Sequence, residues 1–587
     1  MSAICGICGT VGASESAILA AMLEAVSYRG DRSDTASASG IAFGFRWWTG
    51  RRGKSEGIAR DANGMAMVAG SFSPPAPLGM SPAADLVTVL ASPTRLAALD
   101  GNFTGVRWDA AARRLTLVRD PFGMRSLYYV VHRGAFYFAS ELKQLLAIPD
   151  LPIEADPVAL HKYLTFSFVP GEDVPVRGIK RLLPGRVAVW EKGALTVTPY
   201  FTLREDIDPA LADQQAAVRL IRTLGREAVA KRVYGEREVG LFLSGGLDSS
   251  GVAVWLKDAG AGVRALSLDF GDRSVEREQA SVVAGALGIP LSFVKVSGDD
   301  LLPHLTDLVW KLDLPFGDPV TGPQFLLAQA ARQAGLTCVF NGEGGDQLFG
   351  GWTSKPMVAA ELYAGLYGED TRAARYLESY HRFYGLEDEL YTASFREQVG
   401  APGQRRALLE PYLSSEHAST FLNRVRLADI SLKGSQNILP RMERTAQCWG
   451  LDVRAPLFDR ALAEASFRIP PQLKLRGATE KYVLKLALQQ DLPKEIVWRR
   501  KFGMGVPITD WTLGPLAPWI EELLGPRSLA ARGLLRPEYI AQLRAGRDTP
   551  DEIRRRRIGE RLWTLAMMEA WLRVFIDGRG RKPAGLQ

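Results

Sequence analysis

The sequence contains few cysteines, few histidines and no long apolar run. Four cysteines and five histidines are spread over 587 residues. So few cysteines argue against a disulfide framework, and the pair Cys5 and Cys8 lacks the further ligands that zinc requires. No stretch reaches the roughly 20 apolar residues of a membrane helix, and no basic segment followed by an apolar stretch opens the chain. These absences predict a cytoplasmic protein with no membrane partner.

The sequence also lacks a strong charge imbalance, internal repeats and low-complexity segments. Its formal net charge is +7, and 47% of its residues are apolar and 23% charged, as in ordinary globular proteins. Basic residues are not interleaved with aromatics as in nucleic-acid-binding surfaces, so we predict no nucleic-acid partner. The run Arg554 to Arg557 predicts a solvated helix face, with contact to nucleic acid or an acidic peptide as the weaker alternative.

The pattern of apolar residues changes along the chain, whose length predicts two or three domains. Short β-like runs separated by Gly and Asp turns predict a layered β-rich domain in the first part: 41–45, 65–69, 115–118, 127–131 and 186–190. Apolar strands then alternate with helical periodicity at 239–243, 264–268, 291–296 and 337–340. This alternation predicts a doubly wound parallel sheet, and residues beyond about 355 are expected to be mostly helical. We therefore predict an α/β protein with domains at 1–205 and 206–587.

A glycine turn interrupts the apolar run that ends at Leu243. Ser244-Gly245-Gly246 separates this strand from a helical pattern that begins near Ser250. Glycines let the backbone approach an anion closely, and the helix start adds unpaired N–H groups and partial positive charge. No Lys-Ser/Thr pair closes the turn, so it is not a Walker loop. The turn predicts a phosphate cradle, although these glycines alone leave a purely structural turn open.

A second glycine-rich loop, Asn341–Gly351, follows the expected strand 337–340. Strand ends of a parallel sheet meet at one edge, so we expect this loop to face the first one. Asp248 and Asp346 would then supply oxygen ligands for Mg²⁺, while Glu343 does not bind the metal and could act as a general base on an incoming amine. The alternative is that these acids only cap helices and turns.

The chain resembles the asparagine synthetase family along its whole length. Ser244-Gly-Gly-Leu-Asp-Ser-Ser250 is similar to the pyrophosphate loop of ATP pyrophosphatases, and Asn341–Gly351 to the family's acidic loop. Further similar segments follow in the family's order: 310–319, 451–459, 480–485 and 500–507, with Trp511 beyond. The resemblance implies an Ntn-hydrolase-like glutaminase domain, followed by an ATP-pyrophosphatase domain that adenylates a carboxylate and forms an amide.

The resemblance also implies roles for individual residues. Mg²⁺ would be held by Asp248 and Asp346, and Glu343 and Lys481 would act at the reacting carboxyl centre. ATP and its pyrophosphate would be contacted by the following residues: Leu243, Ser244, Gly245, Gly246, Asp248, Ser249, Ser250, Ser267, Gly342 and Lys501. Members of this family are often dimers, so the resemblance allows a homodimer.

The N-terminal part is similar to the family's glutaminase domain but departs from it where the chemistry occurs. The similar segments are 5–9, 28–30, 119–129 and 138–143. In active members the nucleophilic cysteine is the first residue, and its own α-amino group is the base. Here Met-Ser-Ala-Ile precedes Cys5, so its nitrogen lies in a peptide bond unless residues 1–4 are removed.

Three further departures affect the binding of glutamine. Ala69-Gly70-Ser71 stands at the expected oxyanion hole, where the family has Asn-Gly-Glu, and losing one oxyanion donor costs on the order of 100-fold to 1000-fold in rate. Trp47, next to Arg46, occupies the place of the arginine that binds the glutamine carboxylate, and Asp85 is the nearest candidate for its amino group. We therefore expect a degenerate glutaminase domain that is kept as a scaffold.

These departures leave three functions to compare. We favour a ligase like the lasso-peptide cyclases, which would join an Asp- or Glu-type carboxylate of a small molecule or peptide to an amine, with a precursor peptide and its leader-binding protein as partners in the peptide case. Glutamine-hydrolysing asparagine synthetase is the main alternative and requires a free Cys5. The acidic loop resembles that of true asparagine synthetases, which disfavours a β-lactam synthetase. A silent binding protein is the third, and the presence of Asp248, Glu343, Asp346 and Lys481 argues against it.

Overall fold

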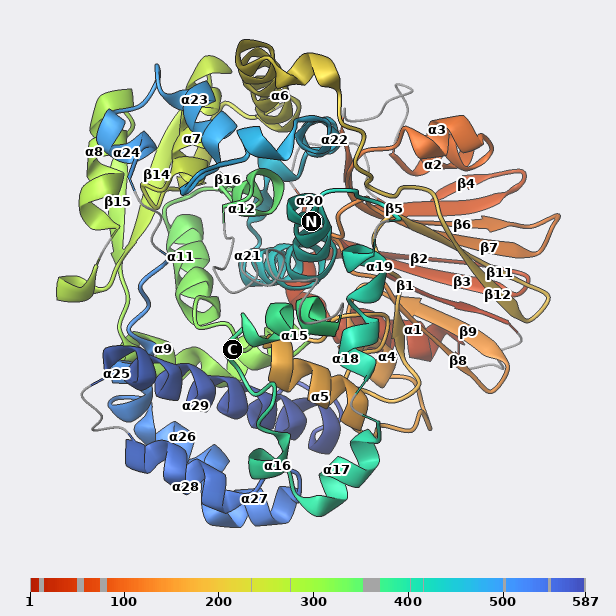
Figure 1. The fold of residues 1–587 in the computed structure, drawn as a ribbon. Helices are drawn as coiled ribbons and strands as arrows, with labels where there is room; N and C mark the ends of the chain where they lie inside the picture. Colours follow the sequence, from red (N-terminus) through yellow and green to blue (C-terminus); the bar gives the residue numbers. More distant parts are fainter. Residues whose placement is uncertain are drawn as a thin grey trace.

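The computed structural model describes most of the chain, and its elements are numbered as in Figure 1. The described residues are 2–9, 15–49, 57–73, 82–233, 235–274, 276–351, 370–401, 403–414, 416–499, 503–546 and 551–584. Lys501 lies outside these ranges, so its expected contact with ATP stays a prediction. None of the described helices combines the length and the apolar character that crossing a bilayer requires.

Two antiparallel sheets build the N-terminal domain (Figure 1). The first has the order β10 (Lys180–Arg181), β8 (Tyr128–His132), β9 (Ala135–Ala139), β1 (Ser2–Cys8), β3 (Ile41–Trp47) and β2 (Arg32–Ala38). The second has the order β12 (Ala194–Pro199), β11 (Arg186–Glu191), β7 (Arg114–Arg119), β6 (Gly101–Asp109), β5 (Gly64–Phe72) and β4 (Ala59–Asp61). Every run that we expected to be β-like is a strand here, so the prediction of a layered β-rich domain is confirmed.

Apolar side chains fill three layers of this domain because successive residues of a strand point to opposite faces. One cluster lies between the two sheets and includes Ile4 and Ala69. A second includes Cys5 and packs the first sheet against α1 (Glu15–Glu24) and α4 (Leu142–Leu146). The third packs the second sheet against α2 (Pro82–Leu90) and α3 (Pro93–Ala97).

A parallel sheet forms the centre of the second half. Its order is β15 (Leu291–Lys295), β14 (Gly262–Asp269), β13 (Glu238–Phe242), β16 (Cys338–Phe340) and β17 (Asp452–Arg454). Its helices include α6 (Gln214–Val233), α7 (Leu247–Asp258), α8 (Arg277–Leu287), α9 (Gly298–Leu301), α10 (Leu305–Leu312), α11 (Thr321–Gln333) and α12 (Gly345–Phe349). The four expected strands are confirmed within two residues at each end. β17 was not expected from the sequence, because its single apolar residue, Val453, stands between two charged ones and forms no apolar run.

Helices make up most of the remaining chain, as expected. Around the sheet lie α20 (Phe421–Ala428), the π-helix η5 (Asp429–Ile438), α21 (Leu439–Gln447), α22 (Arg460–Arg468), α23 (Tyr482–Leu488) and α24 (Lys494–Val497). The hairpin of β18 (Leu475–Arg476) and β19 (Thr479–Glu480) precedes α23. The outer helices are α5 (Pro157–Phe166), α15 (Asp370–Glu378), α16 (Glu387–Leu390), α17 (Ala393–Val399), α18 (Gln404–Ala407), α19 (Glu410–Leu413), α25 (Ile508–Leu513), α26 (Ala517–Leu524), α27 (Pro526–Arg532), α28 (Pro537–Ala545) and α29 (Glu552–Leu572).

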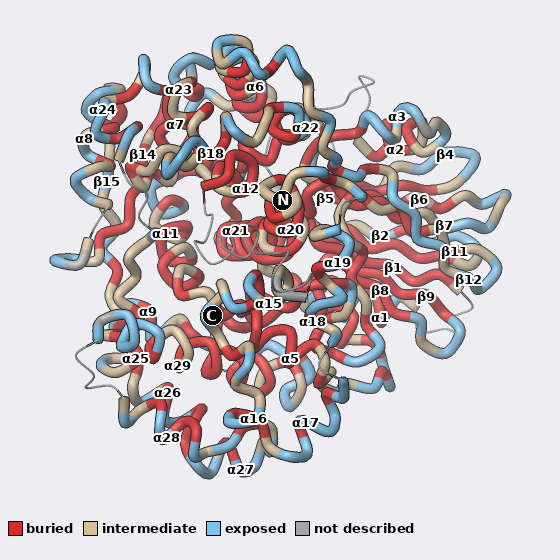
Figure 2. The backbone as a smooth tube through the Cα atoms, in the orientation of Figure 1, coloured by how far each residue is buried: buried red, intermediate tan, exposed pale blue. Residues whose placement is uncertain are grey.

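Buried segments run through the sheets and continue into the helices between them. In Figure 2 the tube is red along α21 and along the C-terminal half of α20, which lie between the antiparallel sheets and the parallel sheet. The two halves of the protein therefore share one buried centre, and the acidic loop, whose residues 345–349 form α12, lies beside it (Figure 1).

Candidate active site

The Ser244–Gly246 turn joins β13 to α7 and is held by its own hydroxyl groups. The Ser244 and Ser249 hydroxyl oxygens lie 3.1 Å apart, and the Ser249 hydroxyl donates to the Gly246 carbonyl at 3.2 Å. Gly245 has φ +66°, and a Cβ there would lie 2.4 Å from the Ala280 backbone nitrogen of α8. Only glycine fits this turn, which leaves backbone N–H groups at the start of α7 as a cradle for phosphate.

Glycines of the acidic loop let it contact the phosphate turn directly. A Cβ on Gly342 would lie 2.3 Å from the Ser249 backbone nitrogen. A Cβ on Gly345 would lie 2.2 Å from Asp248 Oδ1. The two loops that the sequence predicts at one edge of the sheet are therefore in contact, and side chains larger than hydrogen would force them apart.

Lys481 joins the two loops electrostatically. Its Nζ lies 2.5 Å from Asp248 Oδ2 and 2.5 Å from Asp346 Oδ1. The side chain passes so close to Gly351 that a Cβ there would lie 1.9 Å from Lys481 Cε. Burial alone would lower the pKa of Lys481, but the two carboxylates reverse this effect and raise its pKa well above the usual value. Lys481 is therefore a fixed positive charge between two carboxylates.

Asp248 and Asp346 form a donor set that suits Mg²⁺. Because both carboxylates reach the same ammonium group, their oxygens converge on one place. Mg²⁺ in phosphate-binding sites takes one or two carboxylates and completes its shell with phosphate oxygens and water. No cluster of three or more His, Cys, Asp or Glu side chains suited to a metal occurs in the described ranges. The two carboxylates therefore fit a metal shared with phosphates rather than an all-protein site.

Two charged residues that sequence analysis did not identify lie beside this site. Arg499 Nη2 lies 3.9 Å from where a Cβ on Gly246 would stand, so its guanidinium borders the phosphate turn. Glu276 precedes α8, and burial raises its pKa to about 7, with Arg499 lowering and Glu343 raising it. Arg499 directly precedes residues 500–507, a segment similar to the family, so its position next to this motif is a signal that could have identified it. Glu276 belongs to no motif, so its position beside the site could not be predicted from the sequence.

Three other residues expected at ATP are all buried. Leu243 is buried and its N–H donates to the Leu266 carbonyl (2.9 Å), so its side chain belongs to the core. Ser250 is fully buried within α7, and its hydroxyl has no hydrogen-bond partner among the described residues. Ser267 on β14 is also buried, and its hydroxyl has no hydrogen-bond partner among the described residues. A buried hydroxyl without a partner is costly, which makes Ser250 and Ser267 better placed than Leu243 to contact a ligand.

Cys5 does not lie at the start of a strand. It sits in the middle of β1, opposite Gly44 of β3 and Ala139 of β9, and is fully buried. Burial raises the pKa of its thiol far above the usual value. Residues 2–4 continue the same strand, and Ser2 pairs with Trp47. The cysteine that aligns with the family's nucleophile is therefore a core residue in this structure.

Residues expected at the glutamine site have structural partners in the domain. Ala69 belongs to the cluster between the sheets, whereas Cys5 points to the opposite face of its sheet, toward α1 and α4. The Arg46 guanidinium donates to the Ser27 and Gly30 carbonyls at 3.2 and 2.9 Å. Asp85 is fully buried in α2. These residues are used in the structure of the domain.

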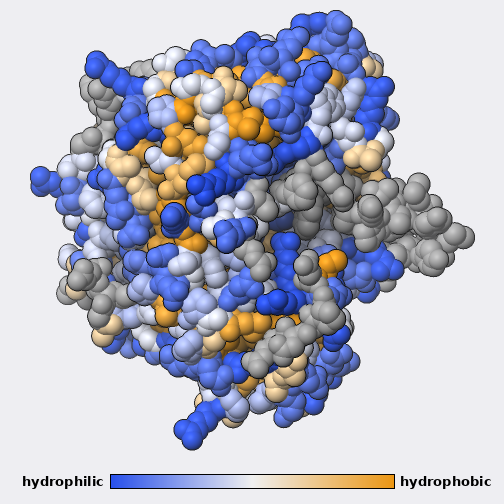
Figure 3. Space-filling model, turned by 90° about the vertical axis from the view of Figure 1, so that its left-hand side faces the viewer, coloured by the Kyte–Doolittle hydropathy of each residue, from blue (hydrophilic) through white to orange (hydrophobic). Residues whose placement is uncertain are grey.

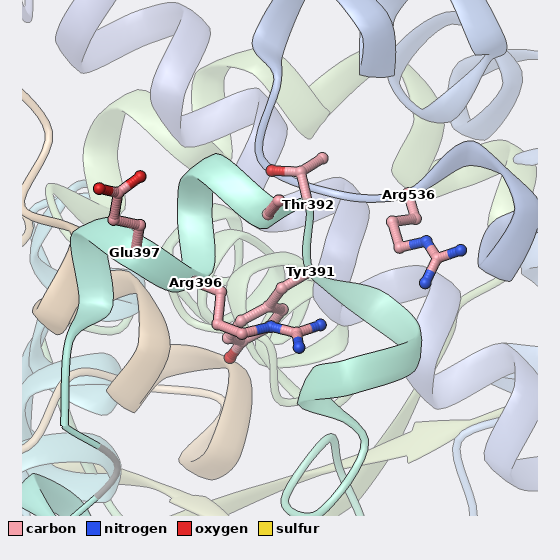
Figure 4. Close-up of a pocket in the computed structure, with 6 residues that line it drawn as sticks. Tyr391, Thr392, Arg396, Glu397 and Arg536 are labelled. Atoms are coloured by element: carbon pink, nitrogen blue, oxygen red, sulfur yellow. The ribbon is translucent and has the colours of Figure 1, made fainter.

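The arginine run and the surface pockets lie away from the two loops. A pocket of about 570 Å³ is lined by Tyr391, Thr392, Ala393, Arg396, Glu397 and Arg536 (Figure 4). Its Arg396 pairs with Asp388 at 2.7 Å. Residues 554–557 are exposed on α29, as the sequence predicts for a solvated helix face. On the side seen in Figure 3, apolar residues gather in the upper left part among hydrophilic ones.

A parallel sheet with two glycine-rich loops in contact at its strand ends is the arrangement of a phosphate-binding α/β domain. A family model described as asparagine synthase matches residues 220–573, and one described as glutamine amidotransferase domain matches residues 89–201. The first match covers more than half of the chain. The chain therefore belongs to the asparagine synthase family and is an ATP-dependent carbon–nitrogen ligase that forms AMP.

Curated relatives resemble the chain over most of its length. Asparagine synthetase [glutamine-hydrolyzing] 1 of Bacillus subtilis (strain 168) is 26% identical over 509 residues, covering 82% of this chain and 78% of the relative. A putative asparagine synthetase [glutamine-hydrolyzing] of Mycobacterium tuberculosis (strain ATCC 25618 / H37Rv) is 28% identical over 514 residues, covering 82% and 77%. A solved structure titled "Structure of the allosteric regulatory enzyme of purine biosynthesis" is 11% identical, covers 50% of this chain and 80% of its own, and has a TM-score of 0.27.

Proposed function

We propose that this ligase adenylates the side-chain carboxylate of an Asp or Glu residue and joins it to an amine that the substrate itself carries. It would thus form a macrolactam, as lasso-peptide cyclases do, with a precursor peptide and its leader-binding protein as partners in the cytoplasm. The observation that carries this proposal is the position of Cys5 in the middle of a buried strand. A thiol in that position has neither a free α-amino group nor access to glutamine.

The proposed reaction has two steps at the two loops. The carboxylate oxygen bonds to the α-phosphorus of ATP as the α–β phosphoanhydride bond breaks and pyrophosphate leaves. The amine nitrogen then bonds to the acyl carbon, the bond to AMP breaks, and Glu343 accepts the proton that the amine loses. Ser244, Gly246 and Ser249 hold the pyrophosphate, and Lys481 offsets its charge. Mg²⁺ on Asp248 and Asp346 would neutralise phosphate charge when bound.

A second feature supports a scaffold role for the N-terminal domain: its glutaminase-like motifs contact the other half of the protein. Asp313 accepts hydrogen bonds from the backbone N–H groups of Leu142 (2.6 Å) and Lys143 (3.0 Å), and so caps α4 from outside its domain. Arg444 on α21 lies 2.9 Å from Glu141. Burial alone would raise the pKa of Glu141, but Arg444 and Lys143 hold it well below the usual range. These motifs have a structural reason to persist without glutaminase chemistry.

Glutamine-hydrolysing asparagine synthetase is the second candidate. The names of the relatives in Bacillus subtilis and Mycobacterium tuberculosis favour it. It requires that Cys5 become the first residue. Ser2 and Ala3 would then leave a strand in which both are buried, together with Ile4 at the face between the sheets. Removing residues 2–4 would remove the stability that this buried strand segment contributes, which argues against a glutamine-hydrolysing asparagine synthetase.

Glutamate release from glutamine, measured with the intact N-terminal mass of the same sample, separates the two candidates. We expect no glutamate release and a chain that retains residues 2–4. Cys5→Ala should then leave ATP-dependent amide formation unchanged, whereas Asp248→Ala should abolish it. Robust hydrolysis by a chain that begins at Cys5, lost in Cys5→Ala, would overturn the proposal in favour of asparagine synthesis.

A further inference from the structure

Asn341 fixes the start of the acidic loop through three contacts. Its backbone N–H donates to the Arg454 carbonyl of β17 at 3.1 Å. Its side-chain amide nitrogen contacts the sulfur of Met442 on α21. Its amide oxygen accepts the backbone N–H of Glu343 at 3.1 Å. The orientation of Glu343 therefore depends on how α21 and β17 are placed relative to each other.

An arginine of the N-terminal domain bridges these two elements. Arg125 follows β7 and is buried, and its Nη1 lies 3.1 Å from Glu443, the residue after Met442. Its Nη2 lies 3.8 Å from Asp452, which begins β17. The Arg125 backbone N–H is itself held by Asp120 at 3.1 Å. The Arg125 guanidinium therefore pairs with a residue close in sequence to each partner of Asn341. Glu443 follows Met442, and Asp452 lies two residues before Arg454.

We propose that Arg125 is a positioning residue that places Glu343 for reaction with the amine, by holding α21 and β17 around Asn341. This inference rests on the proposed function, because it takes Glu343 as the group that accepts the proton. It also gives the N-terminal domain a role in the ligase reaction that needs no glutamine. Asp346 has a separate support, since its carbonyl accepts from Arg426 Nη1 at 2.8 Å. The adenylation step should therefore depend less on Arg125 than the amide-forming step does.

Removing the Arg125 guanidinium leaves neither of its partners, Glu443 and Asp452, without another charged partner. Glu443 also pairs with Arg29, and its other oxygen lies 3.5 Å from Arg444. Asp452 also pairs with Arg454 at 2.9 Å. Both acids keep a partner in Arg125→Met, so we expect this variant to fold with a less tightly held acidic loop.

Amide hydrogen exchange tests the positioning directly, without a substrate. We expect faster exchange of residues 341–346 in Arg125→Met than in the wild type, and an intermediate rate in Arg125→Lys. Arg133→Met is the matched control, because Arg133 is an N-terminal-domain arginine in an exposed ion pair with Asp150 at 3.0 Å. Unchanged exchange of this loop in Arg125→Met would overturn the inference.

Kinetics test whether the positioning matters for the reaction. Pyrophosphate exchange reports adenylation, and amide formation with ammonium as the probe amine reports the second step. A misplacement of about 1 Å can cost on the order of 100-fold in rate, so we expect amide formation in Arg125→Met to fall between about tenfold and 100-fold. Pyrophosphate exchange should fall less, and the KM for ATP should not change.

Two further variants separate failure of this inference from failure of the proposed function. If Arg125 acts through Asn341, the double variant with Asn341→Ala should lose little more than either single variant. Additive losses, or full amide formation in Arg125→Met while Glu343→Gln is inactive, would overturn the role of Arg125. Full activity of Glu343→Gln would instead refute the role of Glu343 in the proposed function.

Discussion

Replacing Lys481 with methionine keeps the length of the side chain but removes the charge between Asp248 and Asp346. Each carboxylate oxygen lies 2.5 Å from the same nitrogen, so the two oxygens are at most about 5 Å apart. Two like charges at this distance repel by about 3 kcal/mol at an effective dielectric constant near 20. Because both aspartates are partly exposed, we expect Lys481→Met to lose about 2–4 kcal/mol of stability.

The effect of magnesium on stability distinguishes loss of this charge from a general loss of stability. In Lys481→Met a bound cation would replace the lost positive charge, whereas in the wild type it must share the carboxylates with Lys481. Magnesium chloride should therefore raise the unfolding midpoint in urea more for Lys481→Met than for the wild type. Lys494→Met, on the exposed first turn of α24, is the control for loss of a lysine.

The activity of the same variants completes the test. Lys481→Met should lose carboxylate-dependent pyrophosphate exchange, and Lys494→Met should retain it. The reasoning is refuted if Lys481→Met is as stable as Lys494→Met, or if magnesium stabilises all three proteins equally. Either result would mean that the two aspartates do not share one electrostatic site.

Three further predictions concern other parts of the structure. Gly342→Ala should lower ATP turnover at least about tenfold, because its Cβ would lie 2.3 Å from the Ser249 nitrogen, whereas Gly285→Ala, in open space within α8, should not. All four cysteines are buried, so the native protein should react slowly with a thiol reagent, and rapid reaction would contradict the buried position of Cys5. Because burial raises the pKa of Glu276 from its ordinary value of 4.5 to about 7, the fold favours the protonated carboxyl group. This contribution to stability is fully present below pH 4.5 and is lost as pH rises through about 7. Urea unfolding should show the wild type losing up to about 3 kcal/mol relative to Glu276→Gln across this window, and parallel pH curves would refute the assignment.

The two loops could be predicted from the sequence because each is a short contiguous motif at the end of an apolar strand. In a parallel sheet such strand ends meet at one edge, so the sequence predicts that Asp248 and Asp346 are neighbours. The sequence shows that the loops are rich in glycine, but it does not show which close contact requires each glycine. Only the structure shows that Gly345 makes room for the Asp248 carboxylate and Gly351 for Lys481.

Contacts between distant segments could not be predicted in the same way. Arg29 and Glu443 are 414 residues apart, and no local pattern links them. Glu276 and Arg499 approach the site through the packing of α8 and the segment after α24. The direction of the Cys5 side chain depends on the register of β1, where a shift by one residue would turn it to the other face. Sequence similarity identified this cysteine but carried no information about its environment.

The most direct test of the account is carboxylate-dependent exchange of pyrophosphate into ATP by the purified full-length protein and by Asp248→Asn. The carboxylates to be compared are aspartate, glutamate and peptides that contain either residue, all without glutamine. We predict exchange with at least one of them in the wild type, and a loss of at least about 100-fold in Asp248→Asn. Exchange that survives in Asp248→Asn, or no exchange with any of these carboxylates, would contradict the assignment of the two loops as the adenylation site.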